Sequence, residues 1–215
     1  MKKSLALCLS TLMSAFMLTP VYADDFLDDI DEGNDHTGWF VGGKVAKISA
    51  EFQDEGEPDK LDGDGTTIGL YFGYNFTEWF GLEFEYSYTG DAKKWLEENP
   101  FVTDAGFGGL RLQPKFTWQI NDTTGLFFKP GVYSAAMVVE RYEIYKFNAR
   151  SSVTDTYSGV GYTLGLGAQF SVTEHLNLRA VYDFSSADLE NDSDISNLTT
   201  EATISEFGVG LHYQF

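Results

Sequence analysis

The sequence has little cysteine, few basic residues and a low overall hydropathy. Its one cysteine, Cys8, lies within the first 23 residues, so the remainder has no disulfide and no cysteine-based metal site. Lys and Arg total 14 against 33 Asp and Glu, and the formal net charge of −19 repels phosphate backbones and excludes nucleic acid as a partner. A mean hydropathy of −0.21 excludes a bundle of membrane-spanning helices. It does not exclude a membrane β-barrel, in which only alternate residues are apolar.

The first 23 residues have the pattern of a secretory signal peptide. Two lysines precede an apolar stretch from Leu5 to Leu18, and the small residue Ala23 lies just before the acidic Asp24. We predict export and cleavage between Ala23 and Asp24. Residues 24–36 then carry seven acids and no base, which predicts a disordered, periplasmic acidic lead-in.

From residue 37 onward, apolar and polar residues alternate in eight runs, as they do in β-strands with two different faces. The runs lie near 37–50, 66–76, 80–89, 106–120, 125–147, 157–171, 176–187 and 202–215. Short turns are expected at 77–79, 121–124 and 173–175, and long polar loops near 51–64, 90–104, 148–156 and 188–201. Short turns on one side and long loops on the other are typical of outer-membrane barrels. We therefore predict an all-β fold, an eight-stranded antiparallel up-and-down transmembrane β-barrel over 37–215.

Aromatic residues gather near the strand ends, in the two bands expected at the membrane interfaces. The band near the short turns includes Trp39, Trp79 and Phe127, and the band near the long loops includes Tyr88 and Phe107. Eight closed strands enclose little more than their own side chains, so the polar, glycine-rich face is expected inside. The long loops hold 17 acids and 4 bases, which makes the cell-surface end acidic.

Three segments carry a family resemblance: Gly38-Trp39-Phe40-Val41-Gly42-Gly43-Lys44, Phe80-Gly81-Leu82-Glu83-Phe84-Glu85-Tyr86, and the last nine residues from Phe207 to Phe215. With them the chain resembles the eight-stranded outer-membrane barrels of the OmpA/OmpX type, over 37–215. The resemblance implies a monomer in the bacterial outer membrane, surrounded by lipid and lipopolysaccharide, with no periplasmic OmpA-like domain. It also implies that Tyr213 and Phe215 form the C-terminal signal read by the barrel-assembly machinery.

The inward face is expected to carry a polar network, because buried charges must be paired. Its predicted members are Lys44, Glu83, Glu85, Arg111, Lys115, Lys129, Gln169, Arg179 and Asp183, with Glu206 and His212 on the same face. The resemblance implies interior ion pairs at Lys44, Glu83, Lys115 and Arg179, whereas Gln169 stands where the family has a glutamate.

The turn between the fourth and fifth runs sets the register inside the barrel. A three-residue turn at 121–123 places Lys115 directly opposite Lys129, with Glu83 as the expected counter-ion for both. The same register places Pro114 opposite Pro130, where we expect a bulge or weak pairing, since proline donates no backbone hydrogen bond.

An enzyme is not expected. Acyl chemistry on outer-leaflet lipid would need a histidine-activated serine near the long loops, whereas His36, His175 and His212 all lie toward the periplasmic side. No cofactor is expected, and no metal either. The acidic stretch at 61–65 lacks the spaced ligands of a calcium loop.

The fifth run continues past the roughly ten residues that cross the membrane. It predicts a protruding strand whose edge captures a partner, with Arg141, Tyr142, Tyr145 and Phe147 as candidate binding residues. Two functions follow: a structural barrel, or a surface-binding protein for adhesion or colonisation, whose partner is a host or cell-surface protein. The alternative is a narrow gated pore for small solutes, against which a polar plug is the simpler interpretation of the network.

Overall fold

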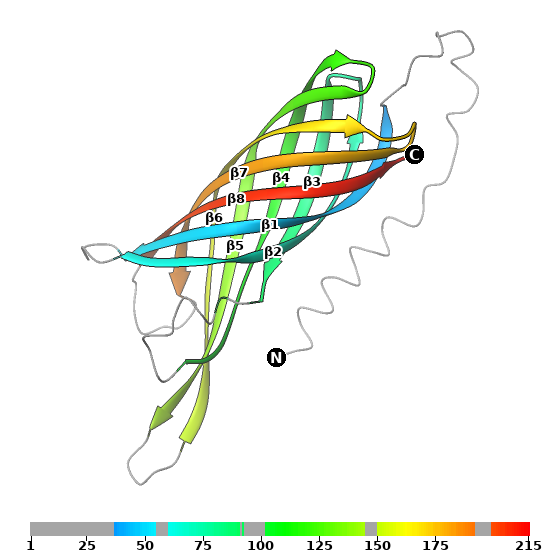
Figure 1. Cartoon of the computed structure of the whole chain (residues 1–215). Coiled ribbons are helices and arrows are strands. Elements are labelled where there is room, and N and C mark those ends of the chain that lie inside the picture. The colour runs from blue at the N-terminus through cyan, green and yellow to red at the C-terminus, as the bar shows by residue number, and fades with distance from the viewer. Residues whose placement is uncertain (1–36, 55–59, 91, 93–101, 145–149, 192–198) are drawn as a thin grey trace, which may run out of the picture. The chain divides into compact units, whose positions relative to one another are not determined.

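The structure, a computed structural model, describes residues 37–54, 60–90, 92, 102–144, 150–191 and 199–215. The eight strands are β1 (Gly38–Asp54), β2 (Lys60–Asn75), β3 (Phe80–Thr89), β4 (Val102–Asn121), β5 (Thr124–Ile144), β6 (Arg150–Ser171), β7 (Leu176–Asn191) and β8 (Thr199–Gln214). Each strand pairs antiparallel with the next, and β8 pairs with β1 to close the barrel (Figure 1). The predicted fold is confirmed. Nowhere in the described ranges is there a helix long and apolar enough to cross a membrane.

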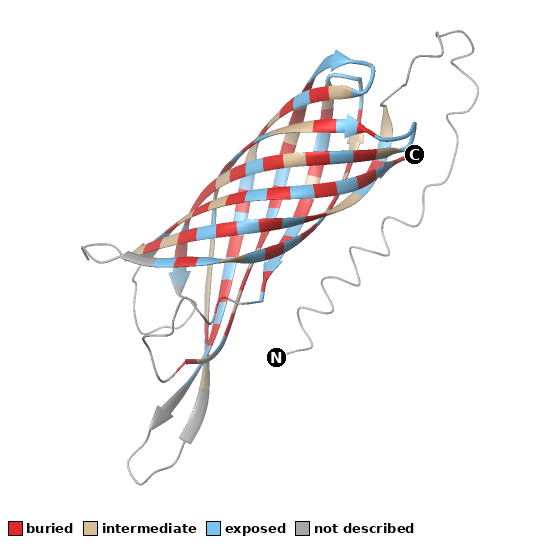
Figure 2. Cartoon of the chain, in the orientation of Figure 1, coloured by how far each residue is buried: buried red, intermediate tan, exposed pale blue. Residues whose placement is uncertain are grey.

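Burial alternates from residue to residue along most of each strand, as the banding in Figure 2 shows. In β1, Lys44 and Ala46 are buried while Val45 between them is exposed. The exposed positions are mostly large apolar side chains, such as Leu70 and Val160, at 65 % and 71 %. Apolar residues outside and polar residues inside fit a barrel surrounded by lipid, because the hydrocarbon accepts only the apolar face.

The strands are staggered around the barrel. Following paired residues from Lys44 through the eight strands leads back to β1 at Asp54, ten residues farther along. Such a stagger tilts the strands and fixes the diameter of a closed barrel. Because of this stagger, a row of residues paired from strand to strand does not stay at one height in the barrel. Side chains that meet across the lumen therefore come from different rows.

Several strands extend beyond the runs read from the sequence, always toward the long loops. β2 begins at Lys60 rather than near 66, and β6 at Arg150 rather than near 157. Within β2, Asp62 and Asp64 are exposed while Gly63 is buried, so the alternation of burial continues. The outer face is acidic there because it lies in water, and the hydropathy pattern that marks a lipid-facing strand is lost. The predicted loops at 51–64 and 148–156 are therefore largely strand.

The β4–β5 turn is shorter than predicted. Asn121 pairs with Thr124 across a two-residue turn, and the Asn121 Oδ1 atom accepts hydrogen bonds from the backbone amides of Thr123 and Thr124, at 3.0 and 2.8 Å. A register shift between Gln119 and Asn121 compensates for the missing turn residue. Beyond this shift the register is the predicted one.

The two prolines that this register aligns interrupt the β4–β5 ladder. Pairs are present at Leu112–Val132 and at Phe116–Phe128, and within this described stretch the positions between them are unpaired. The register is the same on both sides, so the predicted weak pairing around Pro114 is present without a bulge.

Aromatic rings form a belt at the short-turn end. Ring centroids lie 5.2 Å apart for Trp39 and Tyr74, 5.1 Å for Tyr74 and Phe76, and 5.7 Å for Phe76 and Phe80. Two assignments to the bands were wrong, because Phe107 and Phe127 face the lumen and are buried. Each residue lies an even number of positions from an inward-facing residue of its own strand, so its side chain points inward. The alternation of the strand decides which way the ring faces, whether or not it lies near a strand end.

Candidate functional site

The polar residues expected inside the barrel all point into its lumen. Lys44, Glu83, Glu85, Arg111, Lys115, Lys129, Gln169, Arg179, Asp183, Glu206 and His212 are buried. They come from β1 and from every strand from β3 to β8. The lumen is therefore the candidate functional site, and its chemistry differs along the barrel axis.

One set of ion pairs surrounds the ammonium of Lys44. Its Nζ atom lies 2.8 Å from Glu85 Oε1, 2.8 Å from Asp183 Oδ2 and 3.1 Å from Glu206 Oε2. The guanidinium of Arg111 completes the set, at 2.7 Å from Glu85 and 2.7 Å from Glu206. The set thus joins three buried carboxylates to two buried cations by direct contacts.

A second set surrounds Glu83. Lys129 Nζ lies 2.8 Å from Glu83 Oε1, and Arg179 donates from Nη1 to Oε2 at 2.6 Å and from Nη2 to Oε1 at 3.1 Å. This two-fold contact is the fork geometry of a strong arginine–carboxylate pair. Contacts of 3.8 Å between Lys129 and Asp183, and between Arg179 and Glu85, join the two sets into one network.

Three carboxylates of the network could in principle ligate a metal. Oxygen atoms of Glu85, Asp183 and Glu206 lie within 4.8 Å of one another. Lys44 Nζ contacts all three, so a protein cation already occupies the position that a metal ion would take. The arrangement fits a self-contained ion cluster rather than a metal site.

Aromatic rings flank the cations of the network. The Arg179 guanidinium carbon lies 3.4 Å from the centroid of Tyr71, and that of Arg111 lies 4.8 Å from Tyr133. Lys115 Nζ lies 4.6 Å from the centroid of Phe40. Such contacts stabilise buried cations.

Tyr71 and Phe40 were not predicted from the sequence as members of the site. The alternation within β2 and β1 places both on the inward-facing side, so the same pattern that identified the polar residues could have identified them.

Glycines make room for the long side chains. A Cβ atom at Gly165 would lie 2.5 Å from Asp183 Oδ1 and 3.0 Å from Lys129 Cε. A Cβ atom at Gly69 would lie 2.9 Å from Lys44 Cγ. The glycines of the inner face thus leave the space that the long charged side chains occupy.

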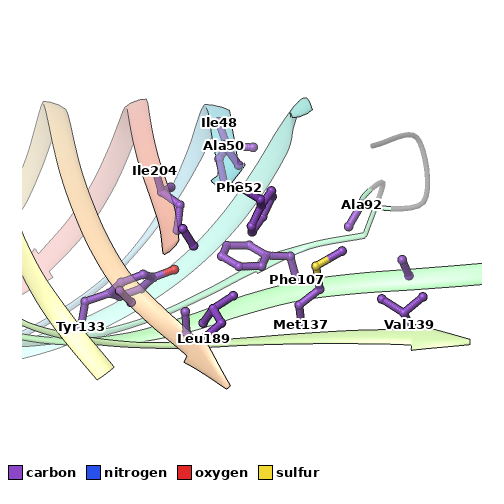
Figure 3. Close-up of a cluster of buried hydrophobic side chains, with 14 of the residues drawn as sticks. Ile48, Ala50, Phe52, Ala92, Phe107, Tyr133, Met137, Val139, Leu189 and Ile204 are labelled. Atoms are coloured by element: carbon purple, nitrogen blue, oxygen red, sulfur yellow. The ribbon is translucent and has the colours of Figure 1, made fainter. Parts of the chain in front are cut away.

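The long-loop half of the lumen is apolar (Figure 3). Its buried cluster comprises Ile48, Ala50, Phe52, Ala92, Val102, Ala105, Phe107, Tyr133, Ala135, Met137, Val139, Ala187, Leu189, Ala202 and Ile204. The rings of Phe52 and Phe107 meet edge to face with centroids 6.0 Å apart. These residues fill the inside of the barrel between the ion network and the long loops.

The family model for the outer membrane protein beta-barrel domain matches residues 7–215. The chain belongs to this family. The barrel accordingly lies in the bacterial outer membrane, in contact with lipid and lipopolysaccharide. No curated protein matches the sequence.

Solved structures agree with this barrel fold. Neisserial surface protein A matches with a TM-score of 0.59 and 13 % identity over 83 % of this chain and 98 % of that one. The outer membrane protein OprG from Pseudomonas aeruginosa matches with a TM-score of 0.51 and 15 % identity over 86 % and 99 %. At these identities the likeness extends to the fold alone.

The two described histidines of this outer-membrane barrel lie toward the short turns. His175 is exposed in the β6–β7 turn, with its ring 5.4 Å from Tyr213. His212 is buried, with its ring 5.4 Å from Phe40 and 6.1 Å from Tyr71. His36 lies outside the described residues.

The C-terminal pair Tyr213 and Phe215 faces outward, with ring centroids 5.1 Å apart. The Phe215 amide donates to the carbonyl of Trp39 at 2.9 Å, where the last strand meets the first. The predicted cleavage residues Ala23 and Asp24 lie outside the described residues.

The candidate surface-binding residues are only partly described. Arg141 lies on β5, where its Nε atom is 2.7 Å from Asp155 Oδ2 on β6. The backbone of Tyr142 belongs to β5 as well. Tyr145 and Phe147 lie outside the described residues.

Proposed function

We propose that this protein is a non-enzymatic surface-binding barrel, in which the β5–β6 hairpin captures a partner protein at the cell surface. The observation that carries the proposal is the length of this hairpin. β5 has 21 residues and β6 has 22, whereas about ten residues cross the membrane. In Figure 1 the hairpin (yellow-green) continues past the ends of the neighbouring strands.

Within the described strands, the projecting part of β6 pairs on one side only. β5 and β6 pair up to Ile144 and Arg150, whereas the pairing of β6 with β7 begins only at Tyr157. From Arg150 to Thr156, β6 therefore pairs with β5 alone within the described strands. Unpaired backbone groups of this kind accept an added strand from another chain.

The negative charge at the long-loop end of the barrel indicates what kind of partner protein would bind there. The segments expected as long loops hold 17 acids and 4 bases, and outward acids such as Asp62, Asp188 and Glu190 are exposed at that end of the barrel. A negative field attracts basic surfaces and speeds their encounter. We accordingly propose a basic host or cell-surface protein as the partner.

The lumen has a structural role in this proposal rather than that of a gated pore. The apolar cluster fills the long-loop half, and the charges in the middle are paired with one another. The proposal also retains a monomeric barrel, a signal peptide cleaved between Ala23 and Asp24, and an assembly signal at Tyr213 and Phe215.

Shortening the hairpin tests the proposal. Replacing residues 142–152 by Asn-Gly joins Arg141 to its partner Val153 with a two-residue hairpin turn. As a matched control, replacing residues 54–59 by Asn-Gly joins Gln53 to its partner Lys60. Bacteria displaying the first variant should lose adhesion to host-cell layers and survival in serum at least tenfold, and the control should keep both.

Folding of both variants is checked by the mobility of unboiled protein on a gel, since a closed barrel resists detergent. Wild-type adhesion by a folded 142–152 variant would show that the barrel is structural only, or that its partner binds elsewhere.

A further inference from the structure

The buried cation Lys115 differs from every other charge in the network. Its side chain lies in the lumen with 3 % of the residue exposed, and its Nζ atom contacts the ring of Phe40. Among the residues that the structure describes, no carboxylate lies within ion-pair distance of it. Glu83, the expected counter-ion, is taken by Lys129 and Arg179.

The charge of the network is unbalanced at the same place. The network holds the four carboxylates Glu83, Glu85, Asp183 and Glu206 and the five cations Lys44, Arg111, Lys115, Lys129 and Arg179. Four of the cations contact a carboxylate at 2.8 Å or less. The set around Lys44 has two cations for three carboxylates, so the excess positive charge lies with Lys129, Arg179 and Lys115, and Lys115 is the one of these three without an ion pair among the described residues. An uncompensated buried ion costs several kcal/mol, which is why buried charges have partners.

The lumen between Lys115 and the short turns offers no anionic side chain within the described strands. Its buried polar side chains are the amides and hydroxyls of Asn75, Thr117, Gln169, Ser171, Asn177 and Gln214 and the imidazole of His212, with the rings of Phe40 and Phe127 beside them. A second cation adds an unused donor, because the buried Nε atom of Arg179 has no hydrogen-bond acceptor among the described residues. Lys115 and the Nε atom of Arg179 thus have no carboxylate partner among the described residues, although the Nη atoms of Arg179 bind Glu83.

We propose that this end of the lumen is a binding site for a small inorganic anion, held by Lys115 and surrounded by neutral polar side chains. A monatomic anion such as chloride fits best, because eight closed strands enclose little more space than their side chains fill. The anion supplies the negative charge that the chain does not, and it becomes part of the folded barrel.

Refolding in two anions tests the site. Barrels are refolded from urea into detergent micelles at constant ionic strength, in sodium gluconate replaced stepwise by sodium chloride. Gluconate is a much larger anion than chloride and should not fit among side chains that fill the barrel. Chloride should raise the thermal unfolding midpoint of the wild type by at least about 2 °C, because a ligand that binds only the folded state stabilises it.

Three variants locate the effect. Lys115→Met removes the charge and should abolish the response to chloride. Gln169→Glu adds a carboxylate at the same end of the lumen without changing side-chain size, and should also abolish it while raising the midpoint in gluconate. Lys47→Met, which removes an exposed lysine on the outer face of β1, should respond as the wild type does.

Two results would overturn the proposal. One is a wild-type midpoint that is the same in gluconate and in chloride. The other is a Lys115→Met barrel that responds to chloride as strongly as the wild type. If Lys115→Met fails to refold, the Gln169→Glu comparison decides in the same way.

Discussion

The middle of the lumen and its long-loop half fill the same eight-stranded barrel with opposite chemistry. In the middle, charged side chains from β1, β3, β4, β5, β7 and β8 neutralise one another across the barrel. In the long-loop half, an apolar cluster packs as the core of a soluble protein does. Ion pairs need particular partners at particular distances, whereas apolar packing needs only shape and volume. The two halves should therefore respond differently to substitution.

The largest loss of stability is expected from Glu83→Gln, which disrupts the ion network in the middle of the lumen. It leaves the cations of Lys129 and Arg179 without their carboxylate, and breaking a buried pair costs about 3–5 kcal/mol. The free energy of unfolding in urea, read from tryptophan fluorescence of lipid-refolded barrels, measures this loss. Glu140→Gln on the exposed face of β5 is the control and should change it by less than about 0.5 kcal/mol.

The same variant distinguishes a plug from a gate. Bilayer conductance of the Glu83→Gln barrel should equal that of the wild type, because the apolar cluster still fills the other half of the lumen. A rise in conductance would instead identify Glu83 as part of a gate.

Phe107→Ala removes a ring from the apolar cluster in the long-loop half of the lumen. Phe107 is buried against Phe52, and removing its ring should cost about 3 kcal/mol. The conservative Phe107→Leu should cost less, since it keeps more of the volume. In a barrel carrying both Glu83→Gln and Phe107→Ala, the two losses should add within about 0.5 kcal/mol. A larger deviation would show that the two halves are coupled.

Gly165→Ala sharpens the comparison by crowding the charged half without removing a charge. The new methyl group would lie 2.5 Å from Asp183 Oδ1, so the variant should lose about 1–3 kcal/mol of stability. Gly43→Ala is the matched control, since its nearest neighbours are at 3.5 and 3.7 Å, an ordinary contact. Equal effects on the urea midpoint would contradict the close packing seen around Gly165.

The smallest effect is expected outside the lumen. Arg141 pairs with Asp155 on the projecting hairpin, where the Arg141 side chain is 44 % exposed and the Asp155 side chain is 7 % exposed. Solvent reaches and screens the guanidinium, so Arg141→Gln should lower the free energy of unfolding by no more than about 1 kcal/mol. The contrast with Glu83→Gln, measured in the same urea series, separates a half-exposed ion pair from the fully buried pairs of the lumen.

Much of this division could be read from the sequence. Alternation placed Lys44, Glu83 and Asp183 on one face, because lipid admits only apolar residues on the other. Parity also fixed Lys115 opposite Lys129, and it held even though the turn has two residues instead of three. The projection of β5 is predicted from the sequence, whereas the outer part of β6, from Arg150 to Thr156, is predicted as a loop because outside the membrane no lipid enforces an apolar outer face.

The partners inside the lumen could not be read in this way. They depend on the ten-residue stagger around the barrel, which no local pattern encodes. Parity alone could not show that Glu83 contacts Lys129 and Arg179 but leaves Lys115 without a carboxylate. It could have identified Phe40 and Tyr71 as inward-facing rings, had aromatic residues not been assigned to the interfaces by default.

The ion network also bears on how the barrel assembles. Lys44 comes from the first strand and Glu206 from the last, while Arg111 in the middle of the chain needs Glu206 as well. An open sheet lacking β8 has no Glu206, although Lys44 still has Glu85 and Asp183 and Arg111 still has Glu85. The two ion pairs of Glu206 therefore form only when the final strand joins the first. They add a stabilisation that a partly inserted sheet lacks, and so favour closure of the barrel.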